Sequence, residues 1–246
     1  QHKPKLFYVI PDFQNPSGRT WSLARRQQLL EVAGGLGLPI VEDAPYRDLR
    51  FEGEELPALV SLDREQRVIF TSTFSKVLCP GLRIGWLVAP AAALEKYILA
   101  KQAADLHTTT LGQLLIATFL EEHDLDRHVA SIRDVCRERR DAMLRALAAW
   151  LPSEVRVSRP AGGLFLWLEL PERMSAREWL RRCLGRGVAF VPGDAFFPDG
   201  GGENAARLCF SDRPESRIAE GVRRMALALR ELPGSERLSW PETMAA

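Results

Sequence analysis

The sequence predicts an α/β fold, with a mostly parallel sheet flanked by helices and a smaller C-terminal α+β domain. Short apolar runs rich in β-forming residues alternate with helical segments through the first half of the chain, as in parallel sheets. A long amphipathic segment then leads into a second half in which short strands and helices are mixed. The 246 residues are enough for roughly one to two domains.

The first half is expected to contain four strands joined by helices. Ser22 can cap a helix that extends to about Gly34, where a group of glycines ends it. The expected strands are residues 6–10, 39–42, 67–71 and 84–88. Two further helices are expected at about 92–104 and 111–122. Chemistry in such sheets gathers on the loops beyond the carboxyl ends of the strands.

The second half is expected to form its own small domain. A helix from about 126 to 150 carries apolar residues on one face, and Pro152 stops it. Strands are expected at 155–158, 164–170, 188–191 and 207–211, and helices at 175–186 and 214–231. We therefore divide the chain into a large domain at 1–125, a small domain at 126–232 and a loosely ordered tail at 233–246.

The composition argues against several classes of protein. Lysine and arginine number 33 against 32 acidic residues, a net charge of +1, so no broad basic field is present for nucleic acid. No apolar run approaches the roughly 20 residues that span a membrane. The four cysteines contain no CxxC pair, and the histidines do not join them at metal-ligand spacing. We expect reduced thiols, no metal site and a cytoplasmic protein.

Two polar clusters follow the first two expected strands. Residues 15–18 read Asn-Pro-Ser-Gly, which by itself is only a turn signal. Residues 42–46 read Glu-Asp-Ala-Pro-Tyr and place a carboxylate directly after a buried strand. Such a carboxylate needs a partner, for example a protonated ring nitrogen. An aspartate that caps the following turn is the simpler alternative.

Two more clusters follow the third strand. Residues 71–76 crowd hydroxyl groups around Lys76, and hydroxyls with exposed backbone amides can hold a phosphate. A neutral lysine amine is a nucleophile that forms Schiff bases with carbonyls, although a surface lysine would also fit the pattern. Arg83 opens the next strand. Its planar guanidinium can bind a phosphate, or it can form a surface ion pair.

The four clusters together match one kind of site. A lysine Schiff base with an acidic partner for the ring nitrogen is the pattern of pyridoxal 5′-phosphate (PLP) sites. The sequence resembles the PLP-dependent aminotransferases of fold type I, class I/II, and within them the 2-aminoadipate, kynurenine and aromatic aminotransferases. The segments that carry the resemblance are YVIPDFQNPSG, IVEDAPYRDLRF, VIFTSTFSKVLCPGLRIGW, PAGGLFLWLELP and ARLCFSDRPESRIAEGVRRM, within residues 6–232.

The resemblance implies catalytic roles for three residues. Lys76 would bind the cofactor covalently and later move the proton of the substrate Cα. Asp43 would pair with the pyridine nitrogen and keep it protonated. Tyr46, together with Asn15, would hydrogen-bond the 3′ oxygen of the ring.

The resemblance also implies binding roles, a reaction and an assembly. Thr73, Ser75 and Arg83 would hold the cofactor phosphate. Arg207, with Asn15, would bind the substrate, and its guanidinium would take the α-carboxylate. The implied reaction is transamination between an α-amino acid and a 2-oxo acid in a homodimer, with no nucleic acid or membrane partner.

Two other functions are compatible with these motifs. GntR-type transcriptional regulators carry an aminotransferase-like effector domain with similar segments, but they tend to read Glu-Asp-Asp-Tyr-Asp at residues 42–46, so the sequence here favours the enzyme. A PLP lyase or decarboxylase of the same fold is the third possible function.

The chain starts with Gln1, so we expect an N-terminal part to precede it. Without that part we expect weak PLP binding and an exposed sheet edge that associates.

Overall fold

The computed structural model describes residues 2–244, which form two compact units. The first unit holds the described residues up to Gln14 together with Arg19–Arg133. The second holds Asn15–Gly18 and the described residues from Asp134 onward. The expected boundary at 125/126 falls at the start of the long helix α5 (Leu125–Trp150), whereas the units divide within that helix. The inclusion of Asn15–Gly18 in the second unit was not foreseen.

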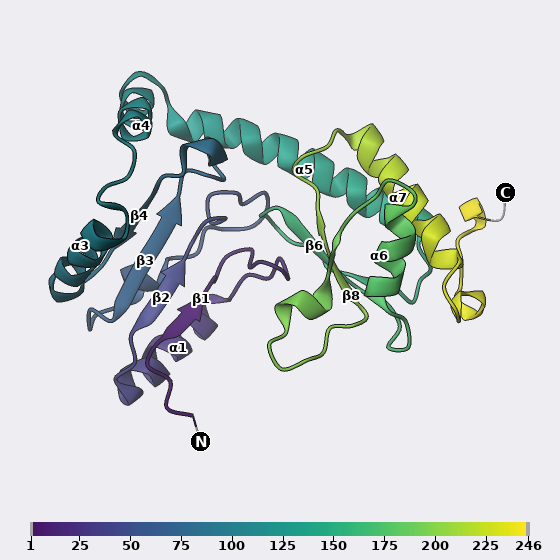
Figure 1. Cartoon of the computed structure of the whole chain (residues 1–246), viewed down its shortest axis with the longest axis horizontal. Helices are drawn as coiled ribbons and strands as arrows, with labels where there is room; N and C mark the ends of the chain where they lie inside the picture. Colours follow the sequence, from purple (N-terminus) through teal and green to yellow (C-terminus); the bar gives the residue numbers. More distant parts are fainter. Residues whose placement is uncertain (1, 245–246) are drawn as a thin grey trace. The chain divides into compact units, whose positions relative to one another are not determined.

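The first unit is built on a four-stranded, mostly parallel sheet, as the sequence predicted. Its strands are β1 (Phe7–Val9), β2 (Ile40–Asp43), β3 (Val68–Thr73) and β4 (Gly85–Val88), in that spatial order (Figure 1). The first three run parallel, and β4 is antiparallel to β3. The helices are α1 (Leu23–Leu36), α2 (Leu59–Leu62), α3 (Ala91–Asp105) and α4 (Thr110–Glu122), with a 3₁₀ turn at Pro80–Leu82.

One face of this sheet is packed against α1 and α2. Alternate residues of the strands point to the same face, and Val9, Ile40 and Val68 form a buried cluster with Ala33 and Leu59. Their burial leaves the other face of the sheet for polar groups. From α1, Leu29 and Leu30 pack against this cluster, whereas Leu23 is exposed.

A buried carboxylate fixes α2, a helix that the sequence analysis did not predict. Glu42 is fully buried, and its carboxylate accepts hydrogen bonds from the backbone amides of Leu59 and Val60, each at 2.9 Å. Burial raises the pKa of Glu42, while these two bonds act in the opposite direction. The carboxylate thus caps the first turn of α2 and ties it to the strand that carries Asp43.

A buried ion pair holds the chain that leaves β1. Arg26 of α1 is fully buried and binds Asp12 at 2.7 Å, and it also donates to the carbonyls of Trp21 and Pro57. Arg50 binds the same carboxylate oxygen at 3.0 Å. A charge without water is costly unless it is paired, so removal of either partner would leave a destabilising group. The network therefore fixes the loop that follows β1.

The helices α3 and α4 expose much of their apolar surface. Within the described chain α3 contains no buried residue, and α4 buries only Gly112 and Ile116. Their exposed apolar side chains include Ile98 and Leu99 of α3 and Leu111, Leu114 and Leu115 of α4. These side chains are therefore accessible to a partner that buries apolar surface.

The second unit combines a four-stranded antiparallel sheet with helices. Its strands are β5 (Arg156–Val157), β6 (Phe165–Glu169), β7 (Val191–Pro192) and β8 (Ala205–Cys209), in the order β5-β6-β8-β7. The helices α5, α6 (Ala176–Leu184) and α7 (Glu215–Arg230) complete it, with a 3₁₀ turn at Gly193–Phe196. Trp179 of α6 is fully buried and donates to the carbonyl of Met225 in α7.

Several expected boundaries differ from the structure for local reasons. The first helix continues through Gly34 and ends at Gly37, whose left-handed φ of 66° closes the helix. The expected strand at 188–191 is wrong in its first residues, because Val188 donates to Cys183 and closes α6. Phe190 instead packs on Trp179 in the core.

The segment expected as a loosely ordered tail makes defined contacts as far as the structure describes it. It contains 3₁₀ turns at Ser235–Arg237 and Glu242–Met244. The backbone amide and hydroxyl of Ser239 donate to the Glu154 carboxylate. Met244 is buried, and Arg230 donates to its carbonyl at 2.8 Å. Residues 245–246 lie outside the described residues.

Gly18 allows the segment Asn15–Gly18 to pack against β6. Its φ is +68°, and a Cβ at this position would lie 2.9 Å from the carbonyl oxygen of Phe165. Only glycine fits this position without displacing the backbone of β6. The close approach therefore explains why a segment so near the N-terminus belongs to the second unit.

We predict that Gly18→Ala destabilises the protein more than Gly37→Ala does. Both glycines have left-handed φ values, but nothing lies within 4 Å of a Cβ at Gly37. The φ cost of about 1–2 kcal/mol is common to both variants, and the clash at Gly18 adds at least ~1 kcal/mol. Urea unfolding followed by tryptophan fluorescence measures the difference. Equal losses in the two variants would contradict the packing described for Gly18.

Candidate active site

The uncovered face of the first sheet carries a row of polar side chains. Tyr8 in β1 lies directly opposite Val41 in β2, and Asp43 is two residues further along β2 on the same face. Thr71 in β3 lies directly opposite Asp43. The pairing of three parallel strands thus places Tyr8, Asp43 and Thr71 side by side near the carboxyl ends of β2 and β3.

The Asp43 carboxylate accepts a hydrogen bond on each oxygen. The hydroxyl of Tyr8 donates to Oδ2 at 2.5 Å, and the hydroxyl of Thr71 donates to Oδ1 at 3.1 Å. Partial burial, the hydrogen bond to Asp43 and the charge of that carboxylate raise the pKa of Tyr8 well above its ordinary value. The sequence analysis found Asp43 but missed Tyr8, because only the strand register shows that these residues meet.

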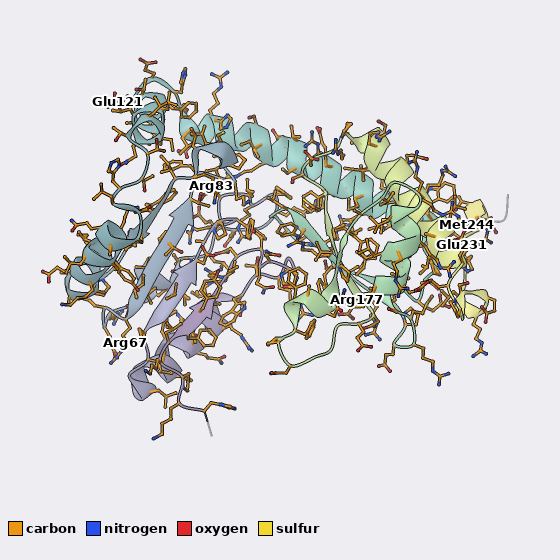
Figure 2. The ribbon with its side chains drawn as sticks, viewed as in Figure 1. Arg67, Arg83, Glu121, Arg177, Glu231 and Met244 are labelled. Atoms are coloured by element: carbon orange, nitrogen blue, oxygen red, sulfur yellow. The ribbon has the colours of Figure 1, made fainter. Side chains whose placement is uncertain are left out.

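The hydroxyls of Thr73 and Ser75 converge with the guanidinium of Arg83. The two hydroxyl oxygens are 3.0 Å apart, and the backbone amide of Ser75 donates to Thr73 Oγ1 at 3.1 Å. Arg83 Nη1 donates to Ser75 Oγ at 3.3 Å. Arg83 has a left-handed φ of 57° as it ends the 3₁₀ turn, and it lies beyond the carboxyl end of β3 (Figure 2). This hydroxyl–guanidinium cluster provides donors for an oxyanion such as phosphate.

Lys76 and Tyr46 occupy the turns that follow the same strands. Lys76 comes directly after Ser75, is half-buried, and its amine makes no hydrogen bond or ion pair with the residues that the structure describes. Tyr46 is buried in the turn after β2, where its carbonyl accepts from the amide of Leu49. The structure therefore gathers the predicted residues of this unit at one end of the sheet.

Asn15 and Arg207 meet in the second unit, although 192 residues separate them. Arg207 in β8 donates from Nη1 to the side-chain oxygen of Asn15 at 2.7 Å. Its Nε is buried and has no hydrogen-bond partner within the described chain. A buried donor without a partner carries a free-energy cost. A carboxylate that approached Nε would satisfy it.

Two aromatic rings pack against the Arg207 guanidinium. The rings of Phe165 and Phe196 have their centroids 4.4 and 5.2 Å from the guanidinium carbon. Phe190, six residues before Phe196, packs on Trp179 in the core and takes no part in this contact.

The part of the chain that the structure describes contains no group of three or more His, Cys, Asp or Glu side chains arranged to hold a metal ion. None of the helices in residues 2–244 is both long and apolar enough to span a bilayer. The candidate functional groups of the first unit are the carboxylate, the lysine amine and the hydroxyl–guanidinium cluster. Arg207, paired with Asn15, is the candidate group of the second unit.

Comparison with known proteins identifies the family. The model of the family "Aminotransferase class I and II" matches residues 3–225. The chain belongs to this family. The chain is also 47% identical to the 2-aminoadipate transaminase of Thermus thermophilus over 235 residues, which are 94% of this chain and 59% of that protein.

Solved structures of aminotransferases share the fold. The α-aminoadipate aminotransferase of Thermus thermophilus, complexed with N-(5′-phosphopyridoxyl)-L-leucine, superposes with a TM-score of 0.90 at 46% identity. The match covers 94% of this chain and 60% of that one. The chain thus spans about three fifths of the length of these relatives.

A regulator is also similar to the chain. An uncharacterized HTH-type transcriptional regulator of Bacillus subtilis is 31% identical over 232 residues, which are 94% of this chain and 48% of that protein. The chain is thus less similar to this regulator than to the Thermus transaminase.

We predict that the hydroxyl–guanidinium cluster binds inorganic phosphate and that Arg83→Ala weakens this binding. Loss of the guanidinium should raise the dissociation constant by about 3- to 10-fold, because charge-assisted hydrogen bonds to phosphate are the strong ones. Amide shifts of Thr73 and Ser75 in a phosphate titration measure the effect. Arg64→Ala, at an exposed arginine away from the cluster, is the control. Equal affinity in the Arg83 variant would contradict the assignment.

Proposed function

We propose that the chain provides cofactor- and substrate-binding residues of a PLP-dependent transaminase, which exchanges an amino group between an α-amino acid and a 2-oxo acid. The single observation that carries the proposal is the Asp43 carboxylate, held between the hydroxyls of Tyr8 and Thr71. It lies at the same end of the sheet as the turn that bears Lys76. Membership of the aminotransferase family supports the proposal.

The donor set of the first unit fits PLP. A phosphate needs several donors, and Thr73, Ser75 and Arg83 bring two hydroxyls and a guanidinium together. A pyridine nitrogen that carries a proton needs an anionic acceptor, which Asp43 supplies. An aldehyde needs a nucleophilic amine, and the Lys76 amine is not engaged with another described residue. Each functional group of the cofactor thus has a matching group in the chain.

The residues then divide the chemistry between them. When bound, PLP supplies an electron sink that stabilises negative charge at the substrate Cα. Asp43 keeps a negative charge beside the ring nitrogen. Lys76 Nζ acts as the base that removes the proton from the substrate Cα. Tyr46 and Asn15, as the resemblance implies, donate hydrogen bonds to the ring oxygen.

Arg207 is proposed to bind the substrate α-carboxylate. Its Nη1 is held by Asn15, and its buried Nε is left to bind a ligand oxygen. Phe165 and Phe196 restrict the guanidinium to one orientation through their ring contacts. An arginine fixed in this way can orient the substrate so that the Cα–H bond is exposed to a base.

The proposed assembly is a homodimer, and the substrate class is that of α-amino acids. The exposed apolar side chains of α3 and α4 support a second copy of the chain as the partner that covers them. The similar Thermus protein is named as a 2-aminoadipate transaminase. The solved structure of the Thermus α-aminoadipate aminotransferase contains N-(5′-phosphopyridoxyl)-L-leucine. We therefore infer that both acidic and apolar side chains are candidates for the substrate.

An effector domain of a transcriptional regulator is the second candidate function. The similarity to a Bacillus subtilis regulator of this type favours it. The Asp-Ala-Pro-Tyr sequence at 43–46 and the higher identity to the transaminase favour the enzyme.

We predict that borohydride fixes PLP covalently on Lys76 when the chain is incubated with the cofactor. Peptide mass spectrometry should find the pyridoxyl group on the peptide that contains Lys76, and Lys76→Ala should lose this label. Lys96→Ala, at an exposed lysine of α3, is the matched control and should keep the label. Label spread evenly over the lysines would contradict a specific site.

We also predict that Arg207→Lys weakens binding of a 2-oxo acid and leaves PLP binding unchanged. Lysine cannot make the paired hydrogen bonds of a guanidinium, so the dissociation constant of 2-oxoglutarate should rise by about 10-fold. Calorimetry with the PLP-loaded chain measures both affinities. The exposed Arg213, replaced by lysine, is the control. Parallel losses of both affinities would assign Arg207 to the stability of the fold instead.

A further inference from the structure

We propose that Tyr8 is a positioning residue of this site: its phenol holds the Asp43 carboxylate in the orientation that receives the ring nitrogen of the cofactor. The inference rests on the proposed function and deepens it. It concerns a residue outside the set that the resemblance implies, and the structure alone brings it to the site. Tyr8 would act through Asp43 without touching the reacting atoms.

The strand register explains why this tyrosine reaches the carboxylate. Tyr8 lies opposite Val41, so Asp43 is its diagonal neighbour on the same face. Diagonal pairs are separated by roughly 7–8 Å between Cα atoms, which long aromatic side chains span. The short aspartate side chain and the long tyrosine side chain therefore meet at 2.5 Å. A shift of register by one residue would turn Tyr8 to the other face.

Two donors on two oxygens fix the plane of the carboxylate. Tyr8 donates to Oδ2 from β1, and Thr71 donates to Oδ1 from β3. Since the donors approach from strands on opposite sides of β2, the carboxylate cannot rotate without losing one bond. Each carboxylate oxygen keeps a second lone pair for another donor. An N–H of the cofactor ring is such a donor.

Tyr8 remains a donor over the pH range in which enzymes act. Partial burial, the hydrogen bond to Asp43, the charge of Asp43 and the neighbouring Tyr46 all raise the pKa of its phenol. Ionisation would place two negative oxygens next to each other, so the protonated phenol is favoured. The hydrogen bond is thus a permanent feature of the site rather than a switch.

The Tyr8 hydroxyl contributes little to the packing of the first unit. The side chain of Tyr8 is 55% exposed, whereas Val9 of the same strand is in the core and Phe7 packs against Trp21. Removal of the hydroxyl therefore leaves the packing of β1 unchanged. A Tyr8→Phe variant isolates the effect of the hydrogen bond on Asp43.

The experiment compares PLP with 1-deaza-PLP, an analogue in which a C–H replaces the ring nitrogen. If Tyr8 acts through Asp43 on that nitrogen, Tyr8→Phe should weaken binding of PLP by about 3- to 10-fold and leave the affinity for the analogue unchanged. Fluorescence titration of the full chain measures both affinities. Tyr97→Phe, at an exposed tyrosine of α3, is the control and should change neither.

The outcomes separate this inference from the proposed function. If the unsubstituted chain prefers PLP to the analogue but Tyr8→Phe weakens both equally, or neither, the role of Tyr8 is overturned and that of Asp43 stands. If the unsubstituted chain binds PLP no better than the analogue, the proposed contact of Asp43 with the ring fails, and the inference fails with it.

A second readout requires no cofactor. The chain contains three tyrosines, so labelling tyrosine Cζ with ¹³C gives three resonances that can be assigned with single phenylalanine variants. In Asp43→Asn the Tyr8 resonance should titrate at lower pH, because the neighbouring charge is gone. The response of the Tyr97 resonance to pH should be the same in the unsubstituted chain and in Asp43→Asn. An unchanged Tyr8 titration would overturn the contact itself.

Discussion

The parallel pairing of β1, β2 and β3 in one register is the constraint on which the site depends. It places Tyr8, Asp43 and Thr71 on one face of the sheet, with Val9, Ile40 and Val68 on the other. The apolar face makes the register strongly preferred, because a slip by one residue would expose the core. The same burial that stabilises the sheet therefore sets the geometry of the Asp43 carboxylate.

Groups beyond the sheet hold the loops in place. Glu42 points to the covered face and caps α2, while its neighbour Asp43 points to the polar face. Adjacent carboxylates thus have separate roles because strand side chains alternate. The buried pair of Arg26 and Asp12 fixes the chain that leaves β1. The end of β3 and the turn after it then bring the hydroxyls of Thr73 and Ser75 together, and Lys76 follows Ser75 in the chain.

The sequence predicted the strands and the residues at their carboxyl ends because both signals are local. Apolar runs identified β2 and β3. Asp43 is the last residue of β2, and Lys76 lies in the turn after β3. Tyr8 was missed, since its contact with Asp43 spans 35 residues and depends on register. The Asn15–Arg207 bond spans 192 residues and depends on packing that Gly18 permits. Arg207 was therefore assigned only through resemblance to a family. That resemblance did not predict the contacts of its guanidinium with Phe165 and Phe196.

A crystal structure of the chain grown with PLP tests the central claim most directly. The account predicts continuous density from the cofactor to Lys76 Nζ, with its phosphate on Thr73, Ser75 and Arg83. The ring nitrogen should lie within hydrogen-bond distance of an Asp43 oxygen that still accepts from Tyr8 or Thr71. Cofactor bound elsewhere, or a ring nitrogen turned away from Asp43, would contradict it.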